Sequence, residues 1–329
     1  MLGGLARRVA FVERMRAEGA QALVVDSGDL FFDSRAGGNS NQVLTKARLI
    51  GRAYKRMGAS AINVGDLDLI QGLDFLRKET SEGLPLISAN LLDSSSKDPI
   101  FSPYIIKEIS RIRVAFFGLL SPEFGPEIEL IIQKIMGAKI LVKDPVEAAQ
   151  ETIQKLKGQA DLVILLSDLG LHKDQMVAKA VPGIHFILGG HEGRFILKSH
   201  KTETTHIFQS SAKGMYVGQL RLTIEKPGSP FKDEREAQNI QEKINNLQLH
   251  LRSLQAAKGR RRGQSIEDLD RAVQDVTRQK NALEEELRRA KESGPQGNRF
   301  LFTLEPMEVR LPEDEEVRKW TAEEGIEKD

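Results

Sequence analysis

The sequence predicts an α/β fold in which two packed β-sheets are flanked by helices, with an antiparallel coiled-coil hairpin inserted. Three observations support this prediction. Short apolar runs typical of buried strands alternate with amphipathic helical segments over residues 22–225. Apolar residues then recur at heptad spacing over residues 231–293. An alternating segment follows over residues 299–310, so we expect the chain to return to the globular domain after the hairpin.

Composition excludes several functional classes. The 329 residues include 48 basic and 47 acidic side chains, so no net field favours nucleic acid or an anionic membrane. Aromatic residues make up only 5%, which argues against a base-stacking surface. The absence of cysteine excludes disulfides, thiolate zinc sites and cysteine nucleophiles. No apolar run approaches the roughly 20 residues of a membrane span, and no signal peptide is visible.

The first half of the chain predicts alternating helices and strands. Asp144-Pro145 is a strong helix start, because Asp caps the first turn and proline is favoured at the first helical position. We expect helices over residues 5–18, 42–57, 71–79, 128–135 and 145–158. We expect strands over residues 22–26, 61–64, 84–90, 104–109, 113–120 and 139–142. Residues 37–41 and 91–98 are expected to form loops.

Residues 161–194 predict strand, loop, helix, strand and loop. A continuous apolar run over residues 161–167 ends in Ser-Asp-Leu-Gly, and a second run over residues 184–188 ends in Gly-Gly-His. A short helix over residues 172–181 separates the runs, and strands over residues 195–198, 206–210 and 216–224 follow. The two runs therefore bring Asp168 and His191 to the carboxyl edge of a sheet, where ligand sites form in open α/β sheets.

The heptad region predicts two helices that pair with each other. Its first arm has apolar residues at alternating spacings of four and three: Ile240, Ile244, Leu247, Leu251 and Leu254. A second arm begins near Ser265, and the glycine-flanked segment 259–263 breaks the pattern between them. We expect Arg260, Arg261 and Arg262 at a solvated tip rather than on nucleic acid.

The expected domains follow from this pattern. They are a globular domain over residues 1–228, the hairpin over 229–297, a returning strand over 298–312 and a charged tail over 313–329.

Four positions share one description: an acidic residue or histidine at the carboxyl end of a predicted strand. They are Asp29, Asp66, Asp168 and His191. Any one of them alone is more often a cap or turn residue than a ligand. Together, three carboxylates and one imidazole suit Mn²⁺, Fe²⁺ or Mg²⁺, with Zn²⁺ kept as an alternative.

The segments GDLFFDS, NVGDLDLI, LISAN, LLSDLGL and GGHEGR, in this order, resemble the metallophosphatase domain of bacterial 5′-nucleotidases, a branch of the calcineurin-like phosphoesterases. The resemblance covers residues 2–225, and residues 300–312 resemble the family's closing strand. It implies a two-sheet metallophosphatase sandwich and hydrolysis of nucleotides or similar small phosphoesters by metal-activated water. It also implies a role in nucleotide catabolism and a periplasmic or exported location, with the cytoplasm kept as an alternative.

The resemblance implies one ligand-complete metal site. Asp29 stands where the family has an Asp that bridges two metals, and His191 keeps a family ligand. Asp66 and Asp168 replace an Asn and a His ligand, and both can still coordinate.

The second metal site is incomplete in this sequence. Leu67 stands where the family has the His that assists the leaving group, so no catalytic residue is assigned there. Gly193 replaces another ligand, and the family's first Asp-x-His motif would lie before Met1. We therefore expect a segment carrying that motif to precede Met1.

Three functions remain open on this basis: a divergent metallophosphoesterase, a degenerate relative that binds metal or ligand without turnover, and a protein whose coiled-coil arm docks a partner. Asn90 and Arg194 are candidates for substrate binding. An arginine can pair with a phosphate, although a surface salt bridge is as good an interpretation of Arg194.

Overall fold

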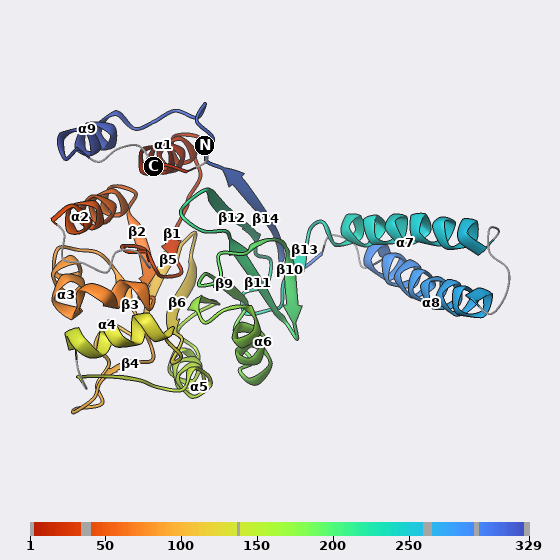
Figure 1. Ribbon diagram of the computed structural model, residues 1–329, viewed down its shortest axis with the longest axis horizontal. Helices are drawn as coiled ribbons and strands as arrows, with labels where there is room; N and C mark the ends of the chain where they lie inside the picture. The colour runs from red at the N-terminus through yellow and green to blue at the C-terminus, as the bar shows by residue number, and fades with distance from the viewer. Residues whose placement is uncertain (1–2, 34–40, 137–138, 259–264, 293–295, 326–329) are drawn as a thin grey trace. The chain divides into compact units, whose positions relative to one another are not determined.

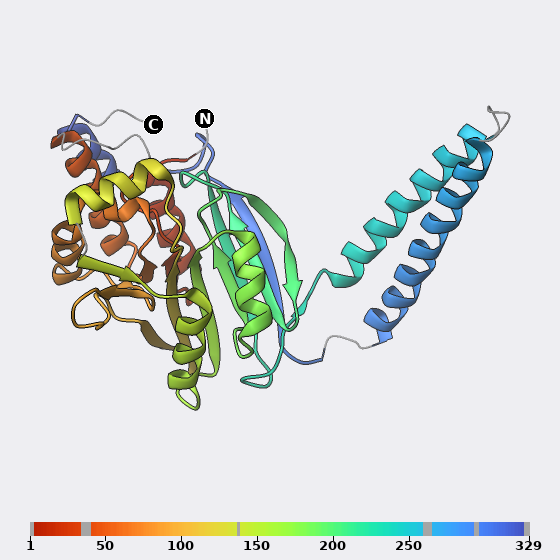
Figure 2. The ribbon, with the colours of Figure 1, turned by 60° about the horizontal axis from the view of Figure 1, so that its bottom comes forward.

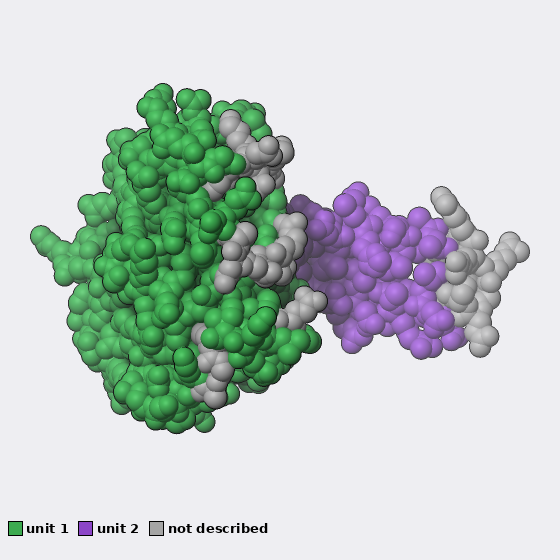
Figure 3. Space-filling view, turned by 60° about the vertical axis from the view of Figure 1, so that its left-hand side comes forward, with its two compact units in different colours: residues 1–219, 302–329 green, residues 220–301 purple. Residues whose placement is uncertain are grey.

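The computed structural model describes residues 3–33, 41–136, 139–258, 265–292 and 296–325 (Figure 1). The chain divides into two compact units (Figure 3). Unit 1 comprises Met1–Gln219 and Phe302–Asp329, and unit 2 comprises Leu220–Leu301. The domain boundaries expected at residues 228 and 297 stay predictions.

The N-terminal part of unit 1 forms a three-stranded parallel sheet with helices. The strands are β1 (Val24–Asp26), β2 (Ala59–Asn63) and β3 (Leu86–Ile87), in that order. The accompanying helices are α1 (Leu5–Ala17), α2 (Asn41–Arg56), the 3₁₀ helix η1 (Leu67–Gln71) and α3 (Leu73–Ser81). A buried apolar cluster that includes Ile62 of β2, Leu69 of η1 and Leu76 of α3 joins the sheet to these helices. Burial of such side chains supplies the main stabilisation of this layer.

A second sheet of six strands lies at the centre of unit 1. Its order is β10-β11-β9-β8-β6-β5, and the four inner strands run parallel while each outer pair is antiparallel. The strands are β5 (Tyr104–Ile109), β6 (Ile112–Leu120), β8 (Leu162–Asp168), β9 (Phe186–Gly189), β10 (Phe195–Thr202) and β11 (Thr205–Ser210). Helices α5 (Pro145–Leu156) and α6 (Leu171–Ala180) pack on one face of this sheet (Figure 2). The Asp144 side chain accepts hydrogen bonds from the amides of Val146 and Glu147, as expected of the helix cap.

The two sheets meet closely at Asn63, at the end of β2. Its Nδ2 donates to the carbonyl oxygens of Ser27 and of Leu119 in β6, at 2.9 Å each. A methyl group at Gly118 of β6 would lie 2.2 Å from Asn63 Oδ1, so only glycine fits there. The two-sheet α/β sandwich with flanking helices is thus confirmed.

The expected loop over residues 91–98 is wrong in its first part. Leu91–Asp93 forms β4, which pairs antiparallel with β7 (Ile140–Val142). Leu91 is fully buried, and this pairing with a strand far away in the sequence gave no local signal. The Asp93 side chain accepts from the amides of Ser95 and Ser96, so the turn begins there. Helix α4 (Pro126–Met136) starts before the expected residue 128.

Unit 2 contains two long helices, α7 (Glu236–Lys258) and α8 (Ser265–Glu292). They pack side by side through Ile240, Ile244 and Leu287, each at most 8% exposed. Coiled-coil geometry over the whole length of the helices stays a prediction. The expected tip, Arg260–Arg262, lies outside the described residues.

The chain continues after α8 with β14 (Arg299–Pro306), the expected returning strand. It is the middle strand of a small sheet with β12 (Tyr216–Thr223) and β13 (Lys232–Asp233). Helix α9 (Glu315–Glu323) follows, and the Asp314 side chain caps it by accepting from the amide of Val317. Within the described parts of the chain, no helix combines the length and apolar character needed to cross a membrane.

Candidate metal centre

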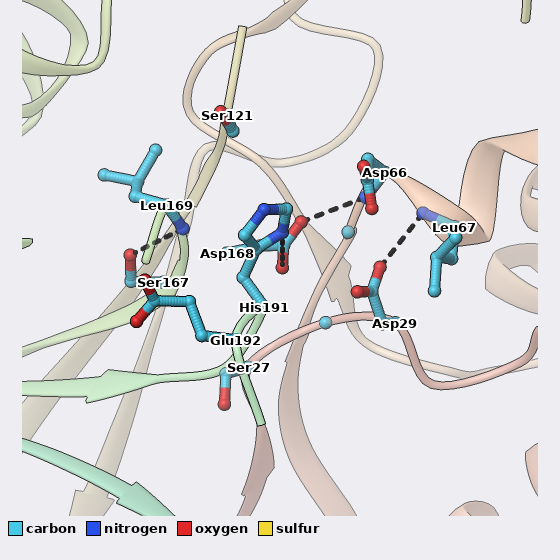
Figure 4. Close-up of polar contacts among 12 residues, drawn as sticks. Ser27, Asp29, Asp66, Leu67, Ser121, Ser167, Asp168, Leu169, His191 and Glu192 are labelled. Carbon is cyan, nitrogen blue, oxygen red and sulfur yellow. Dashed lines mark hydrogen bonds and ion pairs between the residues drawn. The ribbon is translucent and has the colours of Figure 1, made fainter. Parts of the chain in front are cut away.

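The four candidate ligands converge on one point at the carboxyl edge of both sheets (Figure 4). Asp29 follows β1 and Asp66 follows β2, whereas Asp168 ends β8 and His191 follows β9. One ligand atom from each side chain lies within 4.8 Å of the other three. The approach of the β1-β2 sheet to the six-stranded sheet therefore brings together residues up to 162 positions apart (191 − 29).

The backbone at two of these positions is in the left-handed region. Asp29 and His191 both have φ of 56°, which non-glycine residues adopt rarely. Gly65 meets the first of these turns directly, because a methyl group there would lie 2.2 Å from Asp29 Oδ1. The glycine before Asp66 is thus required by the close approach of the two loops.

Asp68 fastens the first two loops together, and sequence reasoning did not assign it this role. Its buried carboxylate accepts hydrogen bonds from the amides of Asp29 (3.0 Å), Phe31 (3.0 Å) and Gly65 (2.9 Å). The Leu67 amide in turn donates to Asp29 Oδ1 at 3.0 Å. The only local signal was the acidic residue two positions after Asp66.

A hydrogen bond joins the two sheets at the cluster, and an ion pair lies within the six-stranded sheet. The Asp66 amide donates to Asp168 Oδ2 at 3.0 Å, and Asp168 Oδ1 lies 3.3 Å from His191 Nδ1. Asp168 is fully buried, whereas the His191 side chain is 32% exposed. The cluster thus combines the buried Asp66 and Asp168 with a partly buried Asp29, and it opens toward solvent at the imidazole.

The electrostatics of the cluster favour a cation. Burial raises the pKa of Asp168 to about 6, and burial together with the charges of Asp168, Asp68 and Asp66 raises the pKa of Asp29 well above its usual value. Contact with Asp168 raises the pKa of His191. Asp168 Oδ1 is buried and, apart from this contact with His191 at 3.3 Å, has no hydrogen-bond partner among the described residues. A bound divalent cation would neutralise this crowded charge, so the donor set fits such an ion.

A second metal site has less support in the described part of the chain, where the only potential metal-binding group is the cluster of four. Leu67 contributes a backbone amide to Asp29 but no ionisable side chain. Gly193 likewise offers no ligand.

The two candidate substrate contacts differ in placement. Asn90 is fully buried, and its amide is engaged: Nδ2 donates to the carbonyl oxygens of Leu120 (2.7 Å) and Lys143 (3.1 Å), while Oδ1 accepts from the Leu120 amide. Asn90 thus ties backbone segments together, and its role as a substrate contact stays a prediction. Arg194 is exposed and pairs with Glu192 at 2.8 Å.

Lys173 is a nearby cation that sequence reasoning missed. Its Nζ donates to Ser121 Oγ at 2.9 Å and pairs with the exposed Glu123 at 3.1 Å. The Ser121 amide donates to the carbonyl oxygen of Asp168, which places Lys173 next to the cluster. No sequence pattern pairs residue 121 with residue 173.

Curated relatives of this chain are metallophosphoesterases and nucleotidases, although no family model matches it. The chain is 29% identical over 228 residues to the uncharacterized metallophosphoesterase YunD of Bacillus subtilis, covering 66% of this chain and 46% of that protein. It is also 29% identical over 212 residues to a 2′,3′-cyclic-nucleotide 2′-phosphodiesterase/3′-nucleotidase of Yersinia enterocolitica, covering 57% of this chain and 32% of that protein. The chain is thus similar to 5′-nucleotidases and related metallophosphoesterases, at 29% identity or less in these matches. It spans only about a third to a half of these two relatives.

Solved structures show the same metallophosphatase fold. A 5′-nucleotidase precursor from Thermus thermophilus matches with a TM-score of 0.57 and 23% identity, over 70% of this chain and 48% of its own. The sulfate thiohydrolase SoxB of Thermus thermophilus matches with a TM-score of 0.67 and 18% identity, over 98% of this chain and 46% of its own.

Proposed function

We propose that this chain is a metal-dependent phosphoesterase that hydrolyses nucleotides or similar phosphoesters through metal-activated water. The convergence of four ligand atoms within 4.8 Å carries this proposal. A divalent cation held by these four side chains would supply an activated water and Lewis-acid assistance to the reaction. The relatives that are phosphodiesterases and nucleotidases support the reaction class.

The residues of this chain would take distinct roles in that reaction. Asp29, Asp66, Asp168 and His191 would hold the cation, and Asp68 would position the first two by its three backbone hydrogen bonds. Lys173 and Arg194 would attract the anionic substrate, because each is an exposed or partly exposed cation beside the cluster or the loop that carries His191.

We propose slow or altered turnover compared with complete two-metal enzymes. Leu67 leaves no proton donor for the leaving group, and general acid–base catalysis contributes about 10²–10⁴-fold. The acidic ligand set favours a hard cation, Mn²⁺ or Mg²⁺, over zinc. It also repels a phosphate dianion more than a monoanion, which favours diesters or activated esters over nucleoside monophosphates. A periplasmic location and a protein partner on α7 and α8 remain further proposals, supported by the family resemblance and by the heptad pattern respectively.

The test is a metal-reconstituted assay of the wild type and Asp29→Ala, with bis-p-nitrophenyl phosphate and AMP as substrates. We expect wild-type turnover of the diester, and its loss in Asp29→Ala together with loss of bound Mn²⁺. Asp98→Ala removes an exposed carboxylate and serves as the control. Equal activity of Asp29→Ala and wild type would refute the metal-dependent mechanism. Rapid hydrolysis of AMP by the wild type would refute the proposal of slow turnover.

The match to a sulfate thiohydrolase over 98% of the chain favours a second candidate, hydrolysis of a sulfur-bound sulfate group. Such a group carries one negative charge, so the acidic cluster would repel it less than a phosphate dianion. S-sulfocysteine is a suitable small probe. Release of sulfate faster than diester hydrolysis by the same metal-loaded protein would favour this candidate over the first.

A further inference from the structure

Asp174 is a buried carboxylate that the proposed reaction does not use. It lies in the first turn of α6 and is 0% exposed. Its Oδ1 accepts a hydrogen bond from Ser167 Oγ. Its Oδ2 has no hydrogen-bond partner among the described residues and lies against Gly189, where a methyl group would stand only 2.8 Å from it.

Ser167 and Gly189, which lie against the two side-chain oxygens of Asp174, each precede a candidate ligand in the chain. Ser167 comes immediately before Asp168, and its Oγ accepts from the amide of Leu169, at the turn that follows (Figure 4). The Ser167 carbonyl oxygen accepts from the amide of Gly190 at 2.8 Å. Asp174 therefore contacts the ends of β8 and β9 together, where they carry Asp168 and His191.

We propose that Asp174 is a positioning residue for the metal centre: through Ser167 and Gly189 it sets the spacing between Asp168 and His191. This inference rests on the proposed metal-binding function. A buried carboxylate is costly, and burial raises its pKa to about 7, so an apolar side chain would serve simple packing better. The small residue at Gly189 fits the same interpretation, because any larger side chain would push Asp174 away from the strand ends.

The test measures Mn²⁺ binding by calorimetry and by the EPR spectrum of the bound ion, so it does not depend on activity. Asp174→Ala should raise the dissociation constant for Mn²⁺ by about 10–100-fold, the usual cost of losing a group that orients a metal ligand. Asp174→Asn keeps an acceptor for Ser167 and should restore affinity to within about threefold. Ser167→Ala removes only the hydroxyl and should weaken binding in the same direction as Asp174→Ala.

Thr152→Ala is the matched control. Thr152 is a buried polar residue on α5 whose Oγ1 donates to the Ala148 carbonyl oxygen, remote in sequence from every candidate ligand. Its loss should leave the dissociation constant and the EPR spectrum unchanged. A spectrum altered by Asp174→Ala but not by Thr152→Ala identifies an effect on ligand geometry and not on general stability.

Two results would overturn the inference, and only the first of them also refutes the proposed metal centre. Wild-type protein that binds no Mn²⁺ would refute the metal centre and the positioning role together. Wild-type protein that binds Mn²⁺ while Asp174→Ala binds it equally well would refute the positioning role alone. If Asp174→Ala does not fold, Ser167→Ala decides: an unchanged dissociation constant would refute the role.

Discussion

At the residue scale, the charge of the ligand set should control substrate choice. Asp66→Asn removes one negative charge and keeps a ligand oxygen. We expect kcat/KM for AMP to rise about tenfold relative to that for bis-p-nitrophenyl phosphate, a change of about 1.4 kcal/mol, because the dianion is repelled more than the monoanion. Steady-state kinetics on both substrates measures this ratio.

The exposed variant Asp98→Asn controls for the loss of a charge elsewhere. It should leave the substrate ratio unchanged. A ratio that does not move in Asp66→Asn would show that charge repulsion does not set substrate preference.

The sequence predicted the four candidate ligands because each follows a strand, and strand ends are visible as apolar runs. It did not predict the polar side chains that surround them. The Asp68 carboxylate accepts from the amide of Asp29, 39 residues away, and Lys173 donates to Ser121 Oγ, 52 residues away. Such contacts appear only when segments distant in the chain pack together. For the same reason no sequence pattern indicated that the Asn90 amide joins two backbone segments.

At the element scale, strands with a strong local sequence pattern were predicted well. Very short strands, which only their pairing with another segment defines, were not. The apolar runs of β6, β8 and β9 matched, because these strands are buried on both faces. The short β4 and β13 were missed, since two or three residues show no periodicity.

The helix pair of unit 2 offers a second prediction. Ile244 of α7 is 2% exposed, and Leu249 of the same helix is 62% exposed. Ile244→Asp should unfold α7 and α8, because it places an unpaired charge in the apolar contact between the two helices. Far-UV circular dichroism should show loss of helix, while Mn²⁺ binding persists because all four ligands lie in unit 1.

Leu249→Asp makes the same chemical change at an exposed position and should leave the helical signal intact. Loss of Mn²⁺ binding in Ile244→Asp would show that folding of unit 1 depends on the helix pair. Deletion of residues 231–293 then tests partner docking, because loss of a partner with retained Mn²⁺ binding would assign that role to the helices.

At the scale of the whole molecule, folding gathers and buries several carboxyl groups around the candidate site. Asp29 and Asp66 arrive from one sheet and Asp168 from the other, and Asp68 and Asp174 are buried beside the strand ends. Burial raises the pKa of Asp68 and of Asp174 to about 7. The metal-free fold therefore holds protons that the unfolded chain, with a pKa near 3.8, releases.

This difference predicts how stability depends on pH. A raised carboxyl pKa makes the folded state the better proton binder, so stability is lost as pH rises from about 4 through 7. With EDTA present, the melting temperature should fall between about pH 5 and pH 8, and less steeply in Asp174→Asn, which has no carboxyl to ionise. Mn²⁺ should raise the melting temperature strongly at pH 8 and weakly at pH 5, because protons compete for the ligands at pH 5. Differential scanning fluorimetry measures both series, and a metal-free melting temperature that rises over this interval would contradict the charge burial argued here.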